Sequence, residues 1–343
     1  MTVFSRKTFS LSKIMIVAFL TVLVSAHAVV SLSVQSGFAR STLVAAATES
    51  SSTVTVHYID VGQGDSILID TPDKDVLIDG GPVDAGPTVL SYLGSRGVTH
   101  IDLMVATHVH EDHIGGLVAV LSSVTVVDEV LVNNQTSSSN TYTNFMNLAP
   151  YHKVTVADRG QTFTLTATAN LTVFSPIQPL QFTDPDHAND NSVVVKLQVG
   201  STSFLFTGDA EKQTEQSMLN AGLSLRSNVL KVGHHGSQTS TTQPFLSSVA
   251  PSYAIISAGQ NNQYGHPDPE TIQRLLAQGT TIYGTFQSGT IVASTDGASI
   301  VFQDNPQPIP EFQPAMIFSI LLTATTIAIV THGRKYTVQR RQT

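Results

Sequence analysis

The sequence predicts an α/β fold built as a four-layer sandwich of helix, sheet, sheet and helix. Short apolar or alternating segments typical of β-strands recur from residue 54 to residue 303. Helical stretches are interspersed among them, and from Asn191 the opening strand pattern repeats in outline. No linker divides the interval, so we expect one catalytic domain over residues 48–305.

The first half opens with three closely spaced strands. Residues 54–59 alternate apolar and polar side chains, and residues 66–70 and 75–79 are joined by a Thr-Pro-Asp-Lys turn. This spacing predicts an antiparallel meander. A helix over 88–96, a buried strand over 101–106 and a helix over 114–121 follow. We then expect a strand pair over 124–132, a loop over 133–144 and further strand over 162–174.

The second half begins with a predicted hairpin. Its strands cover residues 192–199 and 202–207, and a helical stretch follows over 210–220. Short strands are expected at 229–232 and 253–258. The domain then closes with a helix over 269–278 and strands over 281–303.

Composition limits the chemistry. The 343 residues are 41% hydrophobic and include no cysteine, which excludes disulfides, thiolate zinc sites and cysteine nucleophiles. All 25 acidic residues lie between Glu49 and Glu311, and that interval holds only nine lysines and arginines. An acidic body repels polyanions at long range, so we do not expect a nonspecific nucleic-acid binder.

The two ends resemble targeting segments. Basic residues precede an apolar run over 14–24, so residues 1–47 are predicted to be a signal peptide or an uncleaved signal anchor. Residues 306–343 combine a proline-rich spacer, an apolar run over 315–330 and a basic tail. We expect a C-terminal membrane anchor helix or a sorting signal, because Pro310-Glu-Phe resembles the PEF-type signals of archaeal surface proteins. Either reading predicts a secreted or cell-surface protein with its catalytic domain outside the cell.

The domain is organised around Thr107-His-Val-His-Glu-Asp-His-Ile-Gly-Gly116. His108 and His110 are two positions apart on an extended segment, so their side chains can grip one cation together. Asp112 and His113 lie where the chain turns towards a helix and can face a second cation. The two glycines let backbone pass close to the site.

This stretch resembles the HxHxDH signature of the metallo-β-lactamase superfamily. The resemblance implies a four-layer αββα sandwich and hydrolysis assisted by two divalent metals, Zn²⁺ or also Mn²⁺. By resemblance, His108 and His110 hold the first metal, and Asp112 with His113 the second. Asp209 matches a bridging carboxylate and one of His234 and His235 the late histidine ligand. Asp79 matches an aspartate that supports the site by hydrogen bonding.

Further motifs resemble the hydrolase domain of ComEC-type competence proteins. They are Asp60-Val-Gly-Gln-Gly-Asp65, Asn189-Asp-Asn-Ser192, Thr207-Gly-Asp209, Lys231-Val-Gly-His-His-Gly-Ser237 and Tyr264-Gly-His-Pro267. The resemblance implies a metal-dependent nuclease in which Asp60 and Asp65 support the ligands. Asp112 is expected to be catalytic. His266 is expected to donate a proton to a leaving oxygen or to bind a phosphate, the alternative being a loop histidine held by backbone. Asn191, Ser192, Gly236 and Ser237 are expected to contact the substrate.

Two departures limit the transfer. The sequence contains no multi-helix channel, so this chain cannot itself carry DNA across a membrane. Asn-Asp-Asn-Ser stands where a middle histidine ligand is expected. His187 lies three residues upstream of Asp190 and is a candidate replacement, although a solvated loop position is favoured.

These observations leave three functions open. The first is an extracytoplasmic phosphodiesterase or nuclease that acts on nucleic acid or nucleotides and is held at the membrane by its C-terminal helix. The second is a hydrolase of small esters, lactones or β-lactams on the same dinuclear site. The third is a non-catalytic surface protein whose site has decayed. No obligate protein partner is expected.

Overall fold

The computed structural model describes residues 53–182 and 187–310. The predicted signal segment, residues 1–47, lies outside these described residues, as do the predicted anchor and the basic tail after residue 310. Within residues 53–182 and 187–310, no helix has both the length and the apolar character needed to cross a membrane.

Eight strands form the first sheet, in the order β15-β14-β1-β2-β3-β4-β5-β6. β1, β2 and β3 pair antiparallel, which confirms the predicted meander, whereas β3 to β6 run parallel. The strands are β1 (Val54–Tyr58), β2 (Ile67–Asp70), β3 (Asp75–Ile78), β4 (His100–Ala106), β5 (Val126–Val132), β6 (Lys153–Val156), β14 (Ile291–Thr295) and β15 (Ile300–Phe302).

Seven strands form the second sheet, in the order β13-β12-β11-β10-β9-β8-β7. β7 to β10 pair antiparallel and include the predicted β9-β10 hairpin, whereas β10 to β13 run parallel. The strands are β7 (Thr162–Thr164), β8 (Ala169–Ser175), β9 (Val194–Val199), β10 (Thr202–Phe206), β11 (Val229–Lys231), β12 (Tyr253–Ile256) and β13 (Thr281–Gly284).

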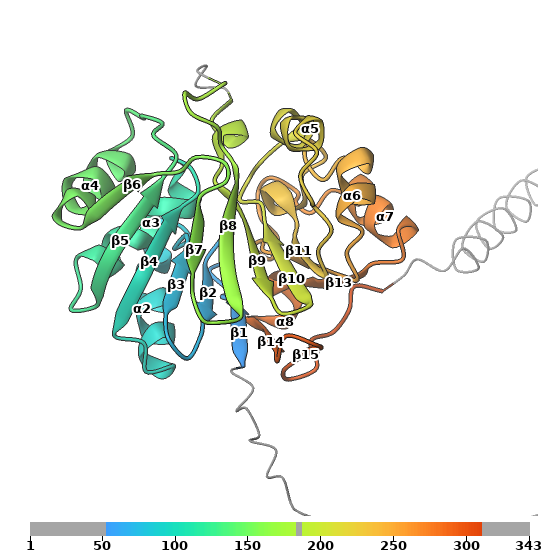
Figure 1. Ribbon diagram of the computed structural model, residues 1–343, viewed down its shortest axis with the longest axis horizontal. Coiled ribbons are helices and arrows are strands. Elements are labelled where there is room, and N and C mark those ends of the chain that lie inside the picture. Colours follow the sequence, from blue (N-terminus) through green and yellow to red (C-terminus); the bar gives the residue numbers. More distant parts are fainter. Residues whose placement is uncertain (1–52, 183–186, 311–343) are drawn as a thin grey trace, which may run out of the picture. The chain divides into compact units, whose positions relative to one another are not determined.

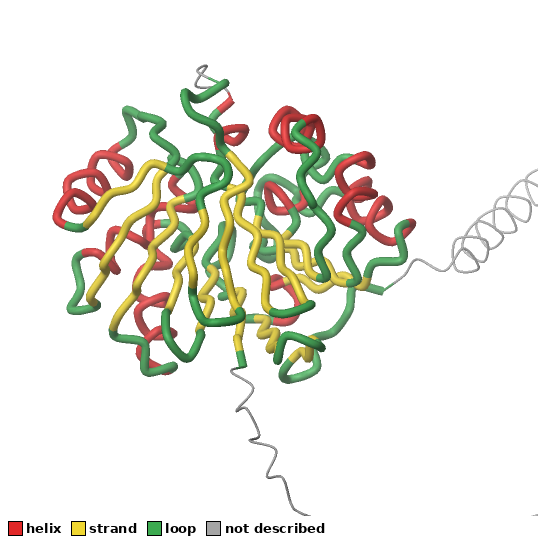
Figure 2. Tube along the Cα trace, viewed as in Figure 1, coloured by secondary structure: helices red, strands yellow, loops and turns green. Residues whose placement is uncertain are grey.

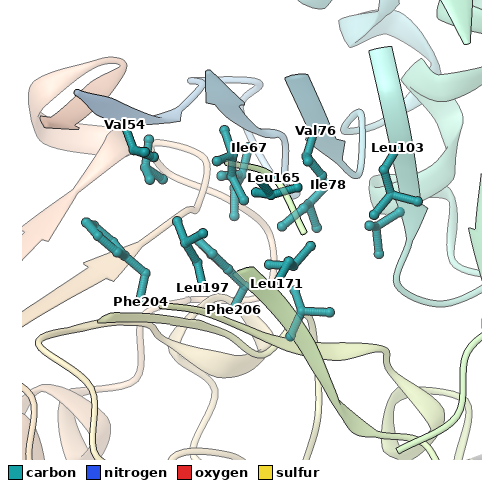
Figure 3. Packing of buried hydrophobic residues seen from close by; sticks show 14 of the residues in the cluster. Val54, Ile67, Val76, Ile78, Leu103, Leu165, Leu171, Leu197, Phe204 and Phe206 are labelled. Atoms are coloured by element: carbon teal, nitrogen blue, oxygen red, sulfur yellow. The ribbon is translucent and has the colours of Figure 1, made fainter. Parts of the chain in front are cut away.

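The inner faces of the two sheets form the main hydrophobic core. Alternate side chains of a strand point to the same face, so each sheet contributes every second residue to this layer. In Figure 3, Ile67 and Ile78 of the first sheet point towards Leu171, Leu197 and Phe206 of the second. All five side chains are at most 1% exposed, and this dry contact holds the sheets face to face.

Helices cover the outer face of each sheet (Figures 1 and 2). α2 (Gly86–Ser95), α3 (Glu111–Leu121) and α4 (Asn140–Leu148) share a second core with the first sheet. α5 (Lys212–Asn220), α6 (Gln243–Val249) and α7 (Pro269–Ala277) share a third core with the second sheet. A short helix, α8 (Thr285–Ser288), follows β13. The layers therefore run helix, sheet, sheet, helix, which confirms the predicted architecture.

Three segments correct the predictions. The segment 124–132 contains one strand, β5 (Val126–Val132), rather than a pair. The segment 133–144, predicted as loop, contains the start of α4, which Ser139 caps by accepting a hydrogen bond from the Tyr142 backbone N–H. Asn and Thr have low helix propensity and hide this helix in the sequence, but burial of Phe145 against the second core stabilises it. The closing strands over 281–303 are divided, because β13 joins the second sheet and β14 and β15 the first.

Candidate metal centre

Strand direction gathers the predicted site residues. β3 and β4 are parallel, as are β10, β11 and β12, and the residues that follow parallel strands lie at one edge of their sheet. His108 follows β4, Asp209 follows β10, and His235 follows β11. Asp65 precedes β2, which is antiparallel to β3, so it reaches the same edge. Direct contacts between these side chains show that the edges of the two sheets meet.

The turn from β4 into α3 places the histidine motif. His110 is the N-cap of α3, with extended backbone (φ −74°, ψ 150°), so Asp112 and His113 fall in the first helical turn. The helix packs very closely on the preceding loop, because a Cβ on Gly116 would lie 1.9 Å from the carbonyl oxygen of Gly80. The Gly80 N–H donates to the His113 carbonyl at 2.7 Å and fixes this contact. The glycine predicted to permit close approach therefore does so.

Four side chains converge on one point. Ligand atoms of Asp112, His113, Asp209 and His235 all lie within 4.8 Å of one another. Asp209 Oδ2 is 3.2 Å from His113 Nε2 and 3.4 Å from His235 Nε2, and His235 Nε2 is 3.2 Å from Asp112 Oδ2. We call these residues the four-group cluster. Two imidazoles and two carboxylates are a donor set that suits a divalent cation.

The groups behind the two histidines fix which nitrogen faces the cluster. His113 Nδ1 lies 2.7 Å from Asp79 Oδ2, and His235 Nδ1 lies 2.9 Å from the carbonyl oxygen of Ser257. A carbonyl and a carboxylate accept hydrogen bonds, so both Nδ1 atoms carry a proton. Both Nε2 atoms face the cluster, and each offers a lone pair to a cation once it is deprotonated. Among the described residues, neither buried Nε2 has a hydrogen-bond partner. This arrangement, with an acceptor behind each ligand nitrogen, is typical of metal-binding histidines.

His108 and His110 lie beside this cluster. His108 Nε2 is 3.0 Å from His110 Nδ1 and 4.0 Å from Asp209 Oδ2. The ring centroids of His108 and His113 are 4.2 Å apart. His108 therefore faces the same Asp209 oxygen that His113 and His235 approach, and His110 is in contact with His108.

The structure separates the adjacent histidines His234 and His235. Both have left-handed backbone, with φ of 47° and 54°, a conformation that costs energy in a non-glycine residue. His235 is 1% exposed and belongs to the four-group cluster. The His234 side chain is 24% exposed, its Nε2 is 3.8 Å from Asp209 Oδ2, and its Nδ1 is 2.9 Å from Glu211 Oε1. His235 therefore occupies the late-ligand position, and His234 lies at the rim.

A buried ion pair lies beneath the cluster. Lys231, which is fully buried, contacts the Asp65 carboxylate, donates to the carbonyl of Gly208 at 3.1 Å and lies 3.9 Å from Asp209 Oδ1. Asp65 Oδ1 is in turn 3.5 Å from His235 Nδ1. Lys231 had no predicted role. Its place within the apolar strand 229–232 nevertheless indicates a buried ion pair, because a lysine is seldom buried without a partner.

The charges of the cluster perturb one another. Burial opposes the charged form of Asp209, but the neighbouring His113 and His235 hold its pKa well below the usual range. Burial likewise opposes protonation of His113, but Asp209 and Asp79 raise its pKa well above the usual value for histidine. The carboxylates thus favour a positive charge at this point, whether it is a proton or a metal ion.

The sequence as a whole matches a family with such a centre. Residues 59–260 match the metallo-beta-lactamase superfamily. The chain belongs to this superfamily.

Curated relatives of this metallo-beta-lactamase chain are competence-type proteins. ComE operon protein 3 of Bacillus subtilis (strain 168) is 33% identical over 261 residues, which cover 69% of this chain and 32% of that protein. Competence protein ComA of Neisseria gonorrhoeae is 31% identical over 234 residues, covering 68% and 31%. The chain thus spans about a third of the length of these relatives. Among solved structures, the metallo-beta-lactamase fold protein YhfI from Bacillus subtilis matches with a TM-score of 0.45 and 14% identity, covering 71% of this chain and all of that one.

Residues 189–192 stand where the superfamily's middle histidine ligand is expected, and Asn189 supplies a side-chain amide there. The structure does not bring His187 to the cluster. Its half-exposed ring lies elsewhere, with Nδ1 3.5 Å from Asp190 Oδ2 and 3.1 Å from Gln213 Nε2. Asn189 faces the cleft of this metallo-beta-lactamase site instead, with its Nδ2 3.2 Å from Glu211 Oε1.

Two of the predicted substrate contacts are corrected. Asn191 and Ser192 are 1% and 0% exposed. Asn191 donates from its side chain to the Phe182 carbonyl, and the Ser192 hydroxyl accepts from the Asp209 backbone N–H at 3.2 Å. Ser192 therefore positions the Asp209 loop and Asn191 anchors the chain at Phe182, and neither residue lines the metallo-beta-lactamase cleft.

Gly236, Ser237 and Asp60 are also corrected. The Ser237 hydroxyl forms a hydrogen bond with the Thr239 hydroxyl, and the Ser237 backbone N–H donates to the His234 carbonyl. Gly236 (φ +87°) packs on Pro267. Both shape the turn that presents the histidine pair. The Asp60 carboxylate accepts from the Gly62 N–H at 3.1 Å and lines a different pocket, so the structure does not bring it to the centre.

A cleft of about 390 Å³ opens over the metallo-beta-lactamase centre. It is lined by Gln63, His110, Glu111, Asp112, Asn189, Asp209, His234, His235, Tyr264 and His266. The His266 ring lies 5.4 Å from the His234 ring, and burial lowers its pKa. Tyr264 belongs to the Tyr-Gly-His-Pro motif but had no predicted role. It is 61% exposed and stacks on His266, with the two ring centroids 5.9 Å apart.

Proposed function

We propose that this chain is a metal-dependent phosphodiesterase that cleaves nucleic acid or nucleotides. The observation that carries the proposal is the convergence of His113 Nε2, His235 Nε2, Asp112 and Asp209 with both histidine Nδ1 atoms engaged behind them. These nitrogens and paired carboxylates fit a divalent cation, and we assign Zn²⁺, with Mn²⁺ as an accepted substitute.

We assign residues to two metal positions. Asp112, His113, His235 and Asp209 would hold one cation, and His108 and His110 would hold the other beside it. Bound divalent cations lower the pKa of water to about 7 and neutralise the charge that develops on a phosphodiester. Asp79 and Ser257 keep the ligand nitrogens oriented, and Lys231 and Asp65 hold Asp209 in place from below.

Residues at the rim bind and orient the phosphodiester. His266 has a buried Nδ1 without a hydrogen-bond partner among the described residues, and its ring adjoins His234. We assign His266 to the leaving oxygen, to which its ring N–H donates a hydrogen bond. Asn189 and His234, which lie in contact with each other in the same cleft, donate hydrogen bonds to the phosphate. Such donors suit a charged phosphodiester better than a neutral lactone or lactam.

The similarity to competence-type proteins supports a nucleic-acid substrate. The acidic body of the chain favours short or single strands over long duplex, because it offers few cations beyond the centre. We also place the catalytic domain outside the cytoplasm, on the basis of the apolar run over 14–24 and the spacer and apolar run after residue 305.

The test is a substrate panel with the full chain. The chain is loaded with Zn²⁺ and incubated with labelled single-stranded DNA, a cyclic dinucleotide, a chromogenic β-lactam and a lactone, with and without chelator. We expect chelator-sensitive cleavage of one or both phosphodiesters. Cleavage of the lactam or lactone alone would replace this proposal with the small-molecule hydrolase.

Asp112→Ala provides the matched variant. The side chain belongs to the four-group cluster and is partly exposed in the cleft, so its removal should lower kcat by at least about 100-fold while leaving the fold intact. Circular dichroism and metal analysis check folding and metal content. Unchanged turnover would remove the assignment of Asp112 to a metal.

A further inference from the structure

We propose that a cavity beside His108 receives one unpaired nucleobase next to the scissile phosphate, so that the enzyme acts on single strands. This inference rests on the proposed phosphodiesterase function and names the form of nucleic acid that the centre takes. It concerns a part of the molecule that the cleft and the metal ligands leave unexplained.

The cavity lies between α3, α4, β5 and β6 and has a volume of about 130 Å³. Its walls include Val109, Ile114, Val132, Phe145 and Met146. An apolar cavity of about 150 Å³ in another protein stays dry and binds benzene, so this volume suits one six-membered ring. A ring that leaves water for these walls gains the hydrophobic free energy of its faces.

The cavity adjoins the metal centre, from which one side chain separates it. His108 lines the cavity, and its Nε2 lies 3.0 Å from His110 Nδ1 and 4.0 Å from Asp209 Oδ2. A ring in the cavity is therefore separated from the centre by the thickness of one imidazole. A sugar separates a phosphate from its own base in a nucleotide, and a flanking nucleoside can bridge this short gap.

The chemistry of the walls favours a base over an alkyl chain. Tyr142 and Phe145 line the cavity, and aromatic side chains are the usual means of holding unpaired bases. The rim carries the amides of Asn134 and Gln135, which suit the polar edge of a base. Asn133 holds this rim, since its Oδ1 accepts from the Gln135 N–H at 3.0 Å, whereas the Asn134 amide makes no hydrogen bond to the described residues. An alkyl chain would use the walls and leave these amides unused.

A paired base cannot enter such a cavity, because it is stacked and hydrogen-bonded within the duplex. The cavity therefore predicts that a duplex is cleaved more slowly than either of its separated strands. Loss of stacking should cost about tenfold in kcat/KM, within the range measured for single bases on aromatic side chains.

The test fills the cavity at its edge. Val156 lines it from the edge strand β6 and is 36% exposed, so Val156→Trp fills the cavity without disturbing the core between the sheets. Val301→Trp on β15, at a position 62% exposed and away from the cavity, is the matched control. Two strands are compared with the full Zn²⁺-loaded chain. One consists of abasic residues with a single nucleobase beside one phosphodiester, and the other is wholly abasic.

We expect the wild type to cleave the base-flanked phosphodiester with about tenfold higher kcat/KM than the abasic strand. Val156→Trp should lose this preference, and Val301→Trp should keep both the preference and the abasic rate of the wild type. A second readout needs no turnover: the chelator-treated wild type should bind a strand with a single thymine about tenfold more tightly than the wholly abasic strand, and Val156→Trp should bind the two equally.

Other outcomes separate the two proposals. Equal cleavage of both strands by the wild type, or an unchanged preference in Val156→Trp, would overturn the base cavity while the phosphodiesterase stands. If turnover of a long-chain lactone fell in Val156→Trp and no strand were cleaved, the phosphodiesterase would fail and the cavity would belong to an acyl chain. Faster cleavage of duplex than of single strands would also contradict the cavity proposal.

Discussion

His113 and His235 owe their orientation to the groups behind them. Asp79 and the Ser257 carbonyl each accept from an Nδ1–H, and this leaves the two Nε2 atoms directed at Asp209. A ligand held in this way does not have to be reoriented when a cation binds, so less conformational entropy is lost. At this scale, the difference between adjacent histidines becomes testable.

Alanine substitution should distinguish the two adjacent histidines. His235→Ala removes a member of the four-group cluster and should lose one equivalent of bound metal, whereas His234→Ala removes a rim residue paired with Glu211 and should retain both. Elemental analysis of the purified full chains measures the difference. The reverse pattern would move the ligand assignment to His234.

Lys231 should be important for stability. Lys231→Met leaves the buried Asp65 carboxylate without its cation and should lower the free energy of unfolding by about 3–5 kcal/mol in urea with chelator present. Lys153→Met, which breaks an exposed pair with Glu129, is the control and should cost at most about 1 kcal/mol. The double variant Lys231→Met/Asp65→Asn tests the pair itself. If its loss of free energy of unfolding equalled the sum of the losses in the two single variants, the two side chains would not interact.

At the scale of elements, α3 carries the motif to the centre and needs an unusually close contact to do so. Gly116→Ala would set a methyl group against the Gly80 carbonyl and should destabilise the domain by about 3 kcal/mol. Gly94→Ala in α2 has open space around the added methyl group and should stabilise by about 0.5–1 kcal/mol. Thermal unfolding of both variants measures these effects, and equal stability of the two would remove the steric explanation.

The sequence predicted most elements because their patterns are local. Alternation identified β1 to β3, and the glycine-flanked motif identified the β4–α3 turn. It did not predict α4, whose polar residues become helical only through packing of Phe145, or the division of residues 281–303 between two sheets. Strand pairing of that kind depends on contacts between residues far apart in the chain, which periodicity does not report.

At the scale of the whole molecule, folding brings the two halves of the chain to one edge. Motif spacing named the ligand candidates but could not choose between His234 and His235, because two adjacent left-handed residues are set by the tertiary turn. It also placed Asn191 and Ser192 at the substrate, although the sandwich buries both. Burial is a property of the assembled layers, so these assignments required the structure.

The free energy of unfolding should depend on pH because of one buried histidine. His57 in β1 is fully buried beside Tyr92, and burial, with a contribution from Arg96, lowers its pKa from 6.5 to about 4. Between pH 6.5 and pH 4 only the unfolded chain binds a proton here, so stability falls as the pH is lowered through this window. His57→Gln should show a shallower fall in urea titrations across the same range. Identical slopes in the two proteins would contradict the shift.

The central claim is that the four-group cluster holds a divalent cation. Anomalous diffraction at the zinc edge, from crystals of the Zn²⁺-loaded chain, tests it directly. We expect a peak at about 2.0–2.1 Å from both His113 Nε2 and His235 Nε2, with Asp209 as a further ligand and a second peak beside His108 and His110. A zinc-loaded crystal with no peak at these atoms, or with zinc bound only elsewhere, would contradict the claim.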